Sequence, residues 1–129
     1  MGAVSLKATL DERLSRITSL SFGQETLAAA LALLSAEIGV PIELDGTALR
    51  AEGITRNQSF ALDLAGGTAR DVLLEIVLLA IPDRSATSPR DPRQELVYVV
   101  DRRAQRILVT TRAAATSGGH PLPPAFGGP

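Results

Sequence analysis

The sequence predicts an α+β fold of two β-α-β halves, with two helices packed between small mixed sheets and a final β-hairpin. Two apolar helical patterns, 27–38 and 69–80, each stand between alternating segments that are typical of strands. The halves also repeat at a constant offset of 42 residues, the offset that separates Leu20 from Leu62. Two β-rich runs follow the second helix and indicate the hairpin.

The first half begins with a short strand over 17–22, where apolar residues alternate with small polar ones, and Gly23 ends it. Segment 27–38 carries Leu and Ile at spacings of three and four, the pattern of an amphipathic helix. Gly39 is a natural stop for that helix. A second strand is predicted over 40–45, where Val, Ile and Leu alternate with proline and acidic residues.

The second half repeats this order. Asp45 is predicted to cap a short turn over 46–50, and a third strand follows over 60–64. Thr68 is the expected N-cap of the second helix, 69–80, which is apolar nearly all round and must therefore be covered on more than one side. Each helical connection is long enough for a crossover, which should be right-handed where its two strands lie parallel in one sheet.

The final elements are a loop and a hairpin. Prolines and charged residues over 82–94 predict an exposed loop. The β-rich runs 96–100 and 107–111 predict the hairpin, with the polar segment 101–106 as its turn.

These elements divide the chain into three parts. We expect a lead-in over 1–13 with a short helical turn at 10–14, one domain over 14–112, and a disordered Pro/Gly linker or tail over 113–129. Gly and Pro are frequent in the last part and few residues there can be buried, which is the basis of that expectation.

Composition excludes several classes of function. The net charge of −1 and the scarcity of aromatic residues argue against a nucleic-acid partner. Cysteine is absent, so disulfides, thiolate metal sites and Cys nucleophiles are excluded. The longest apolar run, 72–81, is about half of what a membrane span needs, and no signal peptide is recognisable at the start.

Catalytic chemistry finds little support. His120 is the only histidine and lies in the Pro/Gly tail, so neither a Ser-His-Asp triad nor a multi-His metal site can form. The carboxylates of Asp63, Asp71 and Glu75 could approach one another, but an outward strand position and a helix start explain the first two better. We expect no enzyme, no cofactor and no metal.

A glycine turn precedes the second helix and admits two interpretations. Gly66, Gly67 and Thr68 could cradle a phosphate at the helix start, but the Lys of a P-loop is missing, so a structural turn is favoured. A KH-like nucleic-acid module would need basic neighbours at such a loop, and only Arg70 is present.

Two groups of residues are candidates for docking a partner. One is the basic cluster of the hairpin turn, which could face an acidic partner or be a solvated turn: Arg102, Arg103 and Arg106. The other flanks the central connector and is either core, the favoured interpretation, or part of a docking surface: Leu49 and Ile54, together with Phe60. Unpaired edges of the small sheets offer a third route, the addition of a partner's strand.

Three stretches resemble a known family, the short N-terminal domain shared by secretins and TonB-dependent receptors (STN), over about 17–111. They are SFGQETLAAALALLSAEIGVPIELD, LDLAGGTARDVLLEIVLLAI and ELVYVVDRRAQRILVTT. The positions that match its spaced leucines, turns and hairpin are Leu27, Leu31, Gly39, Thr68, Leu73 and Ile107. Two features depart from the family pattern: Ile81 and Pro82 replace a Gly turn, and a Pro-rich insertion precedes the hairpin.

The resemblance implies a periplasmic or envelope-associated adaptor without catalytic activity, a fragment of a longer envelope protein that docks onto another envelope component. A structural domain that assembles with copies of itself is the first alternative. A KH-like nucleic-acid module is the second and is disfavoured by the charge balance.

Overall fold

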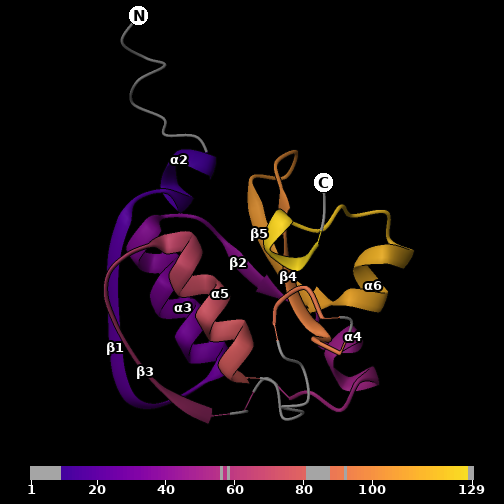
Figure 1. Ribbon diagram of the computed structural model, residues 1–129, viewed down its shortest axis with the longest axis horizontal. Helices are drawn as coiled ribbons and strands as arrows, with labels where there is room; N and C mark the ends of the chain where they lie inside the picture. Colours follow the sequence, from indigo (N-terminus) through magenta and orange to yellow (C-terminus); the bar gives the residue numbers. More distant parts are fainter. Residues whose placement is uncertain (1–9, 56, 58, 81–87, 92, 128–129) are drawn as a thin grey trace, which may run out of the picture.

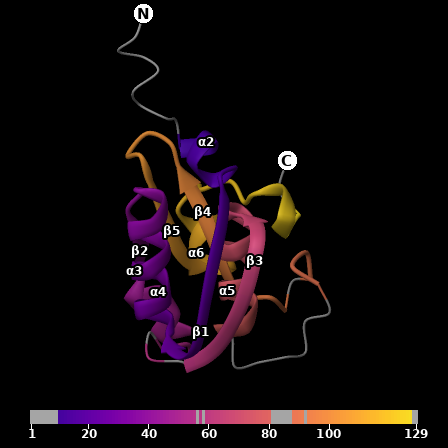
Figure 2. The ribbon, with the colours of Figure 1, turned by 90° about the vertical axis from the view of Figure 1, so that its left-hand side faces the viewer.

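The computed structural model describes residues 10–55, 57, 59–80, 88–91 and 93–127, and confirms an α+β fold with two small sheets. The helices α3 and α5 lie side by side between the two sheets: β1 and β3 are on their left in Figure 1 and in front of them in Figure 2, and β4 and β5 are on the opposite side. The elements in chain order are α2 (Leu10–Leu14), β1 (Ile17–Thr26), α3 (Leu27–Ile38), β2 (Ile42–Leu44), α4 (Gly46–Ala51), β3 (Ser59–Thr68), α5 (Ala69–Ala80), β4 (Leu96–Asp101), β5 (Arg106–Thr111), α6 (Arg112–Ser117) and the 3-10 helix η1 (Pro124–Phe126).

The strands of each half separate into different sheets. β1 pairs antiparallel with β3 in a two-stranded sheet. The other sheet has the order β2-β5-β4, in which β2 runs parallel and β4 antiparallel to β5. No two strands joined by a helix therefore share a sheet in the described part of the chain, and the expected right-handed crossover does not arise.

The strand register explains the internal repeat. The three central pairs of the first sheet are Leu20 with Leu64, Ser21 with Asp63, and Phe22 with Leu62. Asp63 is also the residue that the 42-residue repeat matches with Ser21. The same offset matches Leu20 with Leu62 and Phe22 with Leu64, so it exchanges the Leu20–Leu64 pair with the Phe22–Leu62 pair. A pseudo-two-fold axis therefore passes through the Ser21–Asp63 pair. In the second sheet β2 and β4 flank β5 and run in opposite directions, as this axis requires.

The apolar second helix is covered on several sides, as predicted. α5 contacts β1, β3, α3 and β4. Its fully buried side chains are Ala69, Val72, Leu73, Ile76, Val77 and Ala80. Burial of the aliphatic side chains of this helix removes most of its surface from water, at about 25 cal/mol for each Å² of apolar area. The core of the domain is therefore centred on α5.

The helix ends are held by the residues that the sequence indicates. Asp45 caps α4, because its Oδ1 accepts a hydrogen bond from the Ala48 N–H at 3.2 Å. Thr68 Oγ1 accepts from the Asp71 N–H at 3.1 Å, and Asp71 Oδ2 accepts from the Thr68 N–H at 3.4 Å, which is a reciprocal capping box. Gly39 ends α3 in the left-handed region, with φ 72°.

The paired strands of the first sheet are longer than predicted. β1 continues through Gly23 to Thr26, and β3 continues through Gly66 to Thr68. Two register shifts accommodate the extra residues, and Gly66, with φ 79°, lies beside one of them. A bulge lets a glycine stay inside a strand that its sequence signal would end.

The lead-in belongs to the packed domain where the structure describes it. The predicted helical turn at 10–14 is confirmed as α2, and Leu10 is buried. Arg13 donates a hydrogen bond from its guanidinium to the Ile38 carbonyl at 2.9 Å, at the end of α3. The boundary predicted at residue 14 is therefore too late.

The expectation of a disordered tail over 113–129 is wrong for 113–127. This segment forms α6 and η1, and Ala115 and Phe126 are buried. The Phe126 ring packs edge-on against Tyr98, with centroids 5.3 Å apart. The prediction depends on the Pro and Gly content, but burial of Ala115 and Phe126 helps to hold this segment although it contains helix breakers.

Arg112 fastens this tail and part of the preceding loop. Its guanidinium donates hydrogen bonds to the carbonyl oxygens of Pro89 (3.0 Å), Asp91 (3.1 Å), Gln94 (3.3 Å) and Phe126 (3.1 Å). The predicted loop over 82–94 lies in part outside the described residues. Its described end, from residue 88 onward, is held by Arg112, and Gln94 is buried.

Candidate docking surfaces and a ligand groove

The outer face of the β1–β3 sheet is open. Both strands are ten residues long and pair only with each other among the described residues. The exposed residues at the centre of this face are Ser21, Gly23, Ala61 and Asp63. They surround a shallow hollow of about 460 Å³. Because their side chains are small or absent, side chains cover little of the strands at the centre of this face.

Side-chain hydrogen bonds run across this face. Ser21 Oγ donates to Asp63 Oδ1 at 3.0 Å, and Gln24 Nε2 donates to Ser59 Oγ at 2.7 Å. Asp63 therefore points outward, as its place in the alternation predicts. A long strand edge that no other strand covers is a template for pairing with another chain.

The hairpin arginines fall into two classes. Arg106 is held by two carboxylates: it contacts Glu43 on β2 at 2.7 Å and Asp101 at the end of β4 at 3.3 Å. The hydrogen bond to Glu43 raises the pKa of Arg106 most, and the hydrogen bond to Asp101 raises it further. The hydrogen bond that Asp101 accepts from the Ala104 N–H lowers the pKa of Asp101 most, and the hydrogen bond from Arg106 lowers it further. Arg106 is therefore a tie between β5, β2 and the turn, with its charge compensated.

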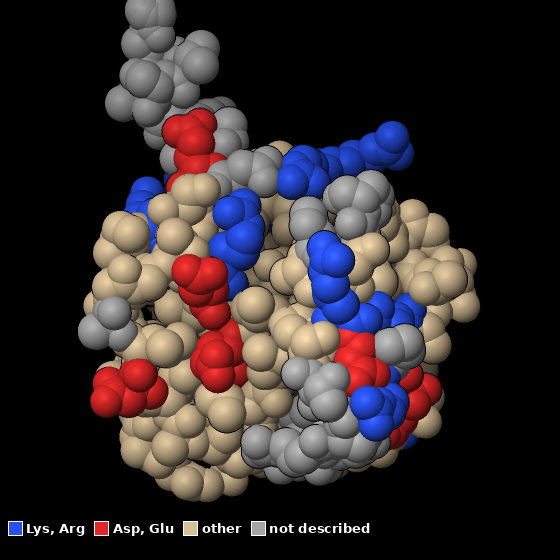
Figure 3. Space-filling model, in the orientation of Figure 1, with Lys and Arg blue, Asp and Glu red and all other residues tan. Residues whose placement is uncertain are grey.

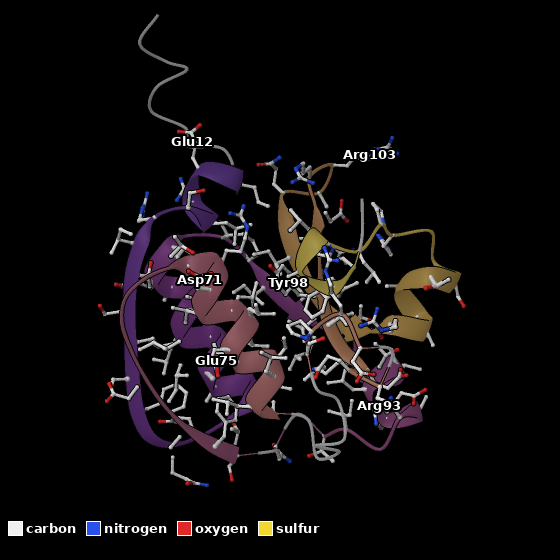
Figure 4. The ribbon with its side chains drawn as sticks, in the orientation of Figure 1. Glu12, Asp71, Glu75, Arg93, Tyr98 and Arg103 are labelled. Carbon is white, nitrogen blue, oxygen red and sulfur yellow. The ribbon has the colours of Figure 1, made fainter. Side chains whose placement is uncertain are left out.

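Arg102 and Arg103 lie in the turn itself and are exposed. The turn is shaped by Gln105, which has φ 57° and donates from Nε2 to the Arg102 carbonyl at 2.6 Å. Figure 4 shows Arg103 projecting away from the body of the protein. Acidic and basic side chains are interspersed on the face seen in Figure 3. The positive patch of the turn is thus confined to Arg102 and Arg103.

Leu49 and Ile54 belong to the hydrophobic core. Leu49 is 1% exposed and Ile54 is 2% exposed, and Phe60 is buried as well. Leu49 lies on the inner side of α4, and its carbonyl accepts the Ile54 N–H at 2.9 Å, which folds the connector back onto the core. The favoured interpretation as core is confirmed for all three residues.

A groove of about 590 Å³ lies between the start of α5, β4 and the C-terminal segment. Arg70 of α5 and Arg102 of the turn are the charged residues among the described residues that line it. Its other walls come from β4 and from the tail: Tyr98, Val100, Pro121, Leu122, Pro123 and Ala125. This volume lies within the usual range for small-ligand sites, roughly 300 to 1,000 Å³.

Tyr98 contributes an unusual group to that groove. The residue is 1% exposed, and its hydroxyl is buried without a hydrogen-bond partner among the described residues. Burial raises the pKa of Tyr98, Arg70 lowers it and Asp71 raises it. Both charged side chains therefore lie close enough to act on the hydroxyl, and Figure 4 shows Asp71 and Tyr98 at the same end of α5.

Glu95 is a second poorly satisfied polar group, outside the groove. Its Oε2 is buried and has no hydrogen-bond partner among the described residues. Burial raises the pKa of Glu95, the Glu52 carboxylate raises it further, and Arg112 opposes both. Ionisation of this carboxyl is therefore less favourable in the folded protein than in an exposed glutamate.

The residues considered for catalysis or phosphate binding do not assemble into a site. Asp63 lies on the outer sheet face, whereas Asp71 caps α5 and occupies the helix start where a phosphate would bind. In the part of the chain that the structure describes, no group of three or more His, Cys, Asp or Glu residues could hold a metal ion. His120 lies near Asp101 and contributes to lowering the pKa of that carboxyl.

The groove was not anticipated from the sequence. Arg70, Tyr98 and Arg102 come from a helix start, a strand and a turn, so no local spacing links them. The one available signal was that Tyr98 is the only tyrosine, placed in an otherwise aliphatic strand.

No family model, curated protein or solved structure matches this chain significantly. None of the helices in the described ranges has both the length and the apolar character needed to traverse a bilayer.

Proposed function

We propose that this chain is a non-catalytic docking domain of a cell-envelope protein, which binds an extended segment of a partner as an added strand on the β1–β3 sheet. One observation carries the proposal: two ten-residue strands pair only with each other in the described part of the chain. Strand addition would supply the missing backbone hydrogen bonds along either outer edge.

The surface chemistry of the sheet supports this mode of binding. Small side chains at Ser21, Gly23 and Ala61 leave the outer face uncovered, so side chains of a strand added at an edge could also contact this face. Among the described residues that line the hollow on this sheet, Asp63 is the only charged one, so few charges would oppose a partner at this sheet.

The order of the elements supports placement in the envelope. A strand leads into a helix, a short strand and a turn, and then a strand, a helix and a hairpin follow. This is the order that the resemblance to the secretin and TonB-dependent receptor domain implies. A periplasmic or envelope location and an envelope protein as partner are parts of the same proposal.

Capture from an envelope extract of Gram-negative cells tests the proposal. The immobilised chain is compared with the double variant Gly23→Lys/Ala61→Lys, which places two positive charges on the sheet face. A side chain at position 23 meets open space, and Ala61 is exposed, so the fold should persist. The matched control, Ala32→Lys/Ala36→Lys, adds the same charge to the exposed side of α3.

We expect one envelope protein to bind the original chain and the α3 control at least tenfold better than the sheet variant. Equal capture by both variants would show that the partner binds elsewhere, and the exposed hairpin arginines would then be the next surface to reverse. Saturable RNA or DNA binding by the original chain would contradict the proposal.

A further inference from the structure

The inner face of the β1–β3 sheet is covered unevenly along its two strands. Opposed residues of an antiparallel pair point to the same face, so Phe22 shares the inner face with Leu62, and Leu20 shares it with Leu64. On β3, Phe60 and Leu62 are buried and Leu64 is partly buried. On β1, Leu20 and Phe22 are both only partly buried. The apolar side chains of the inner face are therefore less completely covered along β1 than along β3.

Helix α3 presents an exposed apolar side chain on the same side of the molecule. Leu33 is 45% exposed, and it is one of two large hydrophobic side chains exposed in the described part of the chain. Ser35 donates a hydrogen bond to the Val40 carbonyl at 2.6 Å, so the Ser35 flank of α3 faces the segment that leads into β2. At about 100° per residue, Leu33 lies about 200° from Ser35, on the opposite flank.

That opposite flank is the one beside β1. Helix α3 contacts α5, β1 and β2, and the exposed Leu33 lies neither on the buried side toward α5 nor on the β2 flank. Figure 2 shows α3 on the side of β1 that faces away from β3. A strand added at the free edge of β1 would therefore lie over α3 and could cover Leu33.

The charged residues beside this edge are mainly acidic. Glu25 pairs with Phe60 and so lies on the inner face, near the end of β1. Glu37 is exposed and follows Leu33 by four residues, so it lies on the same flank of α3. Neither carboxylate forms an ion pair within the described residues. Since Arg16 precedes the other end of β1, two negative charges stand against one positive charge, which favours a basic segment.

We propose that the partner segment pairs with the free edge of β1, and that it is a basic strand with apolar side chains at every second position. Pairing at this edge rests on the proposed function and specifies the edge and the chemistry of the segment. Successive side chains of a strand point to opposite faces, so the apolar ones all point inward and cover Leu20, Phe22 and Leu33. Basic residues at the ends of the segment lie near Glu25 and Glu37.

Three synthetic peptides with blocked ends test this pairing on the whole chain by calorimetry. The first is Lys-Thr-Val-Thr-Val-Thr-Val-Thr-Lys, the second has Glu at both ends in place of Lys, and the third, Lys-Thr-Thr-Val-Val-Val-Thr-Thr-Lys, has the composition of the first without its alternation. We expect the first peptide to bind at least tenfold more tightly than either of the others. Amide hydrogen exchange followed by NMR should show new protection along β1 and none along β3.

Leu33→Gln tests the contact with α3, and Ala32→Gln is its matched control. Ala32 is also exposed, but it lies about 100° farther round the helix, nearer the Ser35 flank. We expect Leu33→Gln to weaken binding of the alternating Lys peptide at least fivefold and Ala32→Gln to leave it unchanged. Equal effects of the two substitutions would overturn the proposal.

Glu25→Gln/Glu37→Gln tests the charges, and Glu52→Gln/Glu75→Gln is the matched control, which removes two carboxylates from α4 and α5. We expect the first variant to lose most of the preference for the Lys peptide over the Glu peptide, and the control to keep it. Equal binding of these two peptides to the original chain would overturn the proposed chemistry. Protection along β3 in place of β1 would overturn the choice of edge and leave strand addition standing. Failure of every peptide to bind would overturn the β1 proposal alone, because capture of a partner from the envelope extract decides the proposed function separately.

Discussion

Replacing Arg112 by Met should destabilise the domain by about 2–4 kcal/mol. Met keeps most of the apolar stem and removes the guanidinium, which donates four hydrogen bonds at 3.0–3.3 Å to carbonyl oxygens of two segments. Hydrogen bonds with one charged partner contribute about 1.5–3 kcal/mol when well buried. Arg112 is half-buried, and water can solvate some of the released carbonyls. We therefore expect a loss of about 2–4 kcal/mol.

Urea denaturation followed by Tyr98 fluorescence measures this loss, because the Phe126 ring that packs on Tyr98 belongs to the segment that Arg112 holds. Arg112→Lys should lose most of the same stability, since one ammonium cannot reach four carbonyls in different directions. Arg103→Met is the control and should change stability by less than about 0.5 kcal/mol. A loss below about 1 kcal/mol for Arg112→Met would refute the reasoning.

Three further predictions concern polar burial and backbone geometry. Tyr98→Phe should leave the unliganded domain equally stable or up to about 2 kcal/mol more stable in urea denaturation, because it removes an unsatisfied hydroxyl; a clear loss would mean that the hydroxyl is bonded. Glu95→Gln should stabilise the domain at pH 7, but not at a pH below the pKa of Glu in the unfolded chain. Folding raises the pKa of Glu95, so the folded state binds more protons than the unfolded state at pH values between the two pKa values. The free energy of unfolding of the original chain therefore falls as the pH rises from the unfolded pKa through the folded one, and the Gln variant does not lose this stability. Thermal unfolding at pH 3 and pH 7 decides this, and a stabilisation of the same size at both would count against it. Gly39→Ala should cost about 1–2 kcal/mol, because φ is +72° and the new Cβ would lie 2.6 Å from the Arg13 guanidinium. Gly23→Ala, in open space, is the control and should cost much less in the same denaturation series.

Local patterns were sufficient to predict the helices and the hairpin. Spaced leucines defined α3, and the nearly uniform apolar character of α5 correctly indicated a helix covered on several sides. The caps at Asp45 and Thr68 were predicted from residue type alone, because capping depends on neighbours within one turn of helix.

The arrangement of the sheets required information that local patterns lack. The repeat suggested two equivalent halves, each with its own connection between strands. The structure instead pairs β1 with β3 across the pseudo-two-fold axis, and this depends on packing between halves that are 42 residues apart, as Ser21 and Asp63 are. The bulges that extend both strands follow from the same long-range pairing.

The candidate sites were predicted only in part. Arg102 and Arg103 are exposed as expected, but Arg106 is paired, because β2 brings Glu43 beside it from 63 residues away. The ordered tail was missed because the Pro and Gly content outweighed the one aromatic residue, Phe126, that the fold buries. The groove needs that ordered tail as a wall and was therefore beyond prediction.

Site-specific photo-crosslinking in cells that produce the chain tests docking through the β1–β3 sheet most directly. A photoreactive residue is placed at Ala61 on β3, at Ala36 on α3, or at Arg103 in the hairpin turn, all of which are exposed. We predict an adduct with a different envelope protein from position 61, and none from position 36. Adducts from position 103 alone would contradict the account, and an adduct of twice the mass of the chain would indicate self-assembly through the same sheet instead.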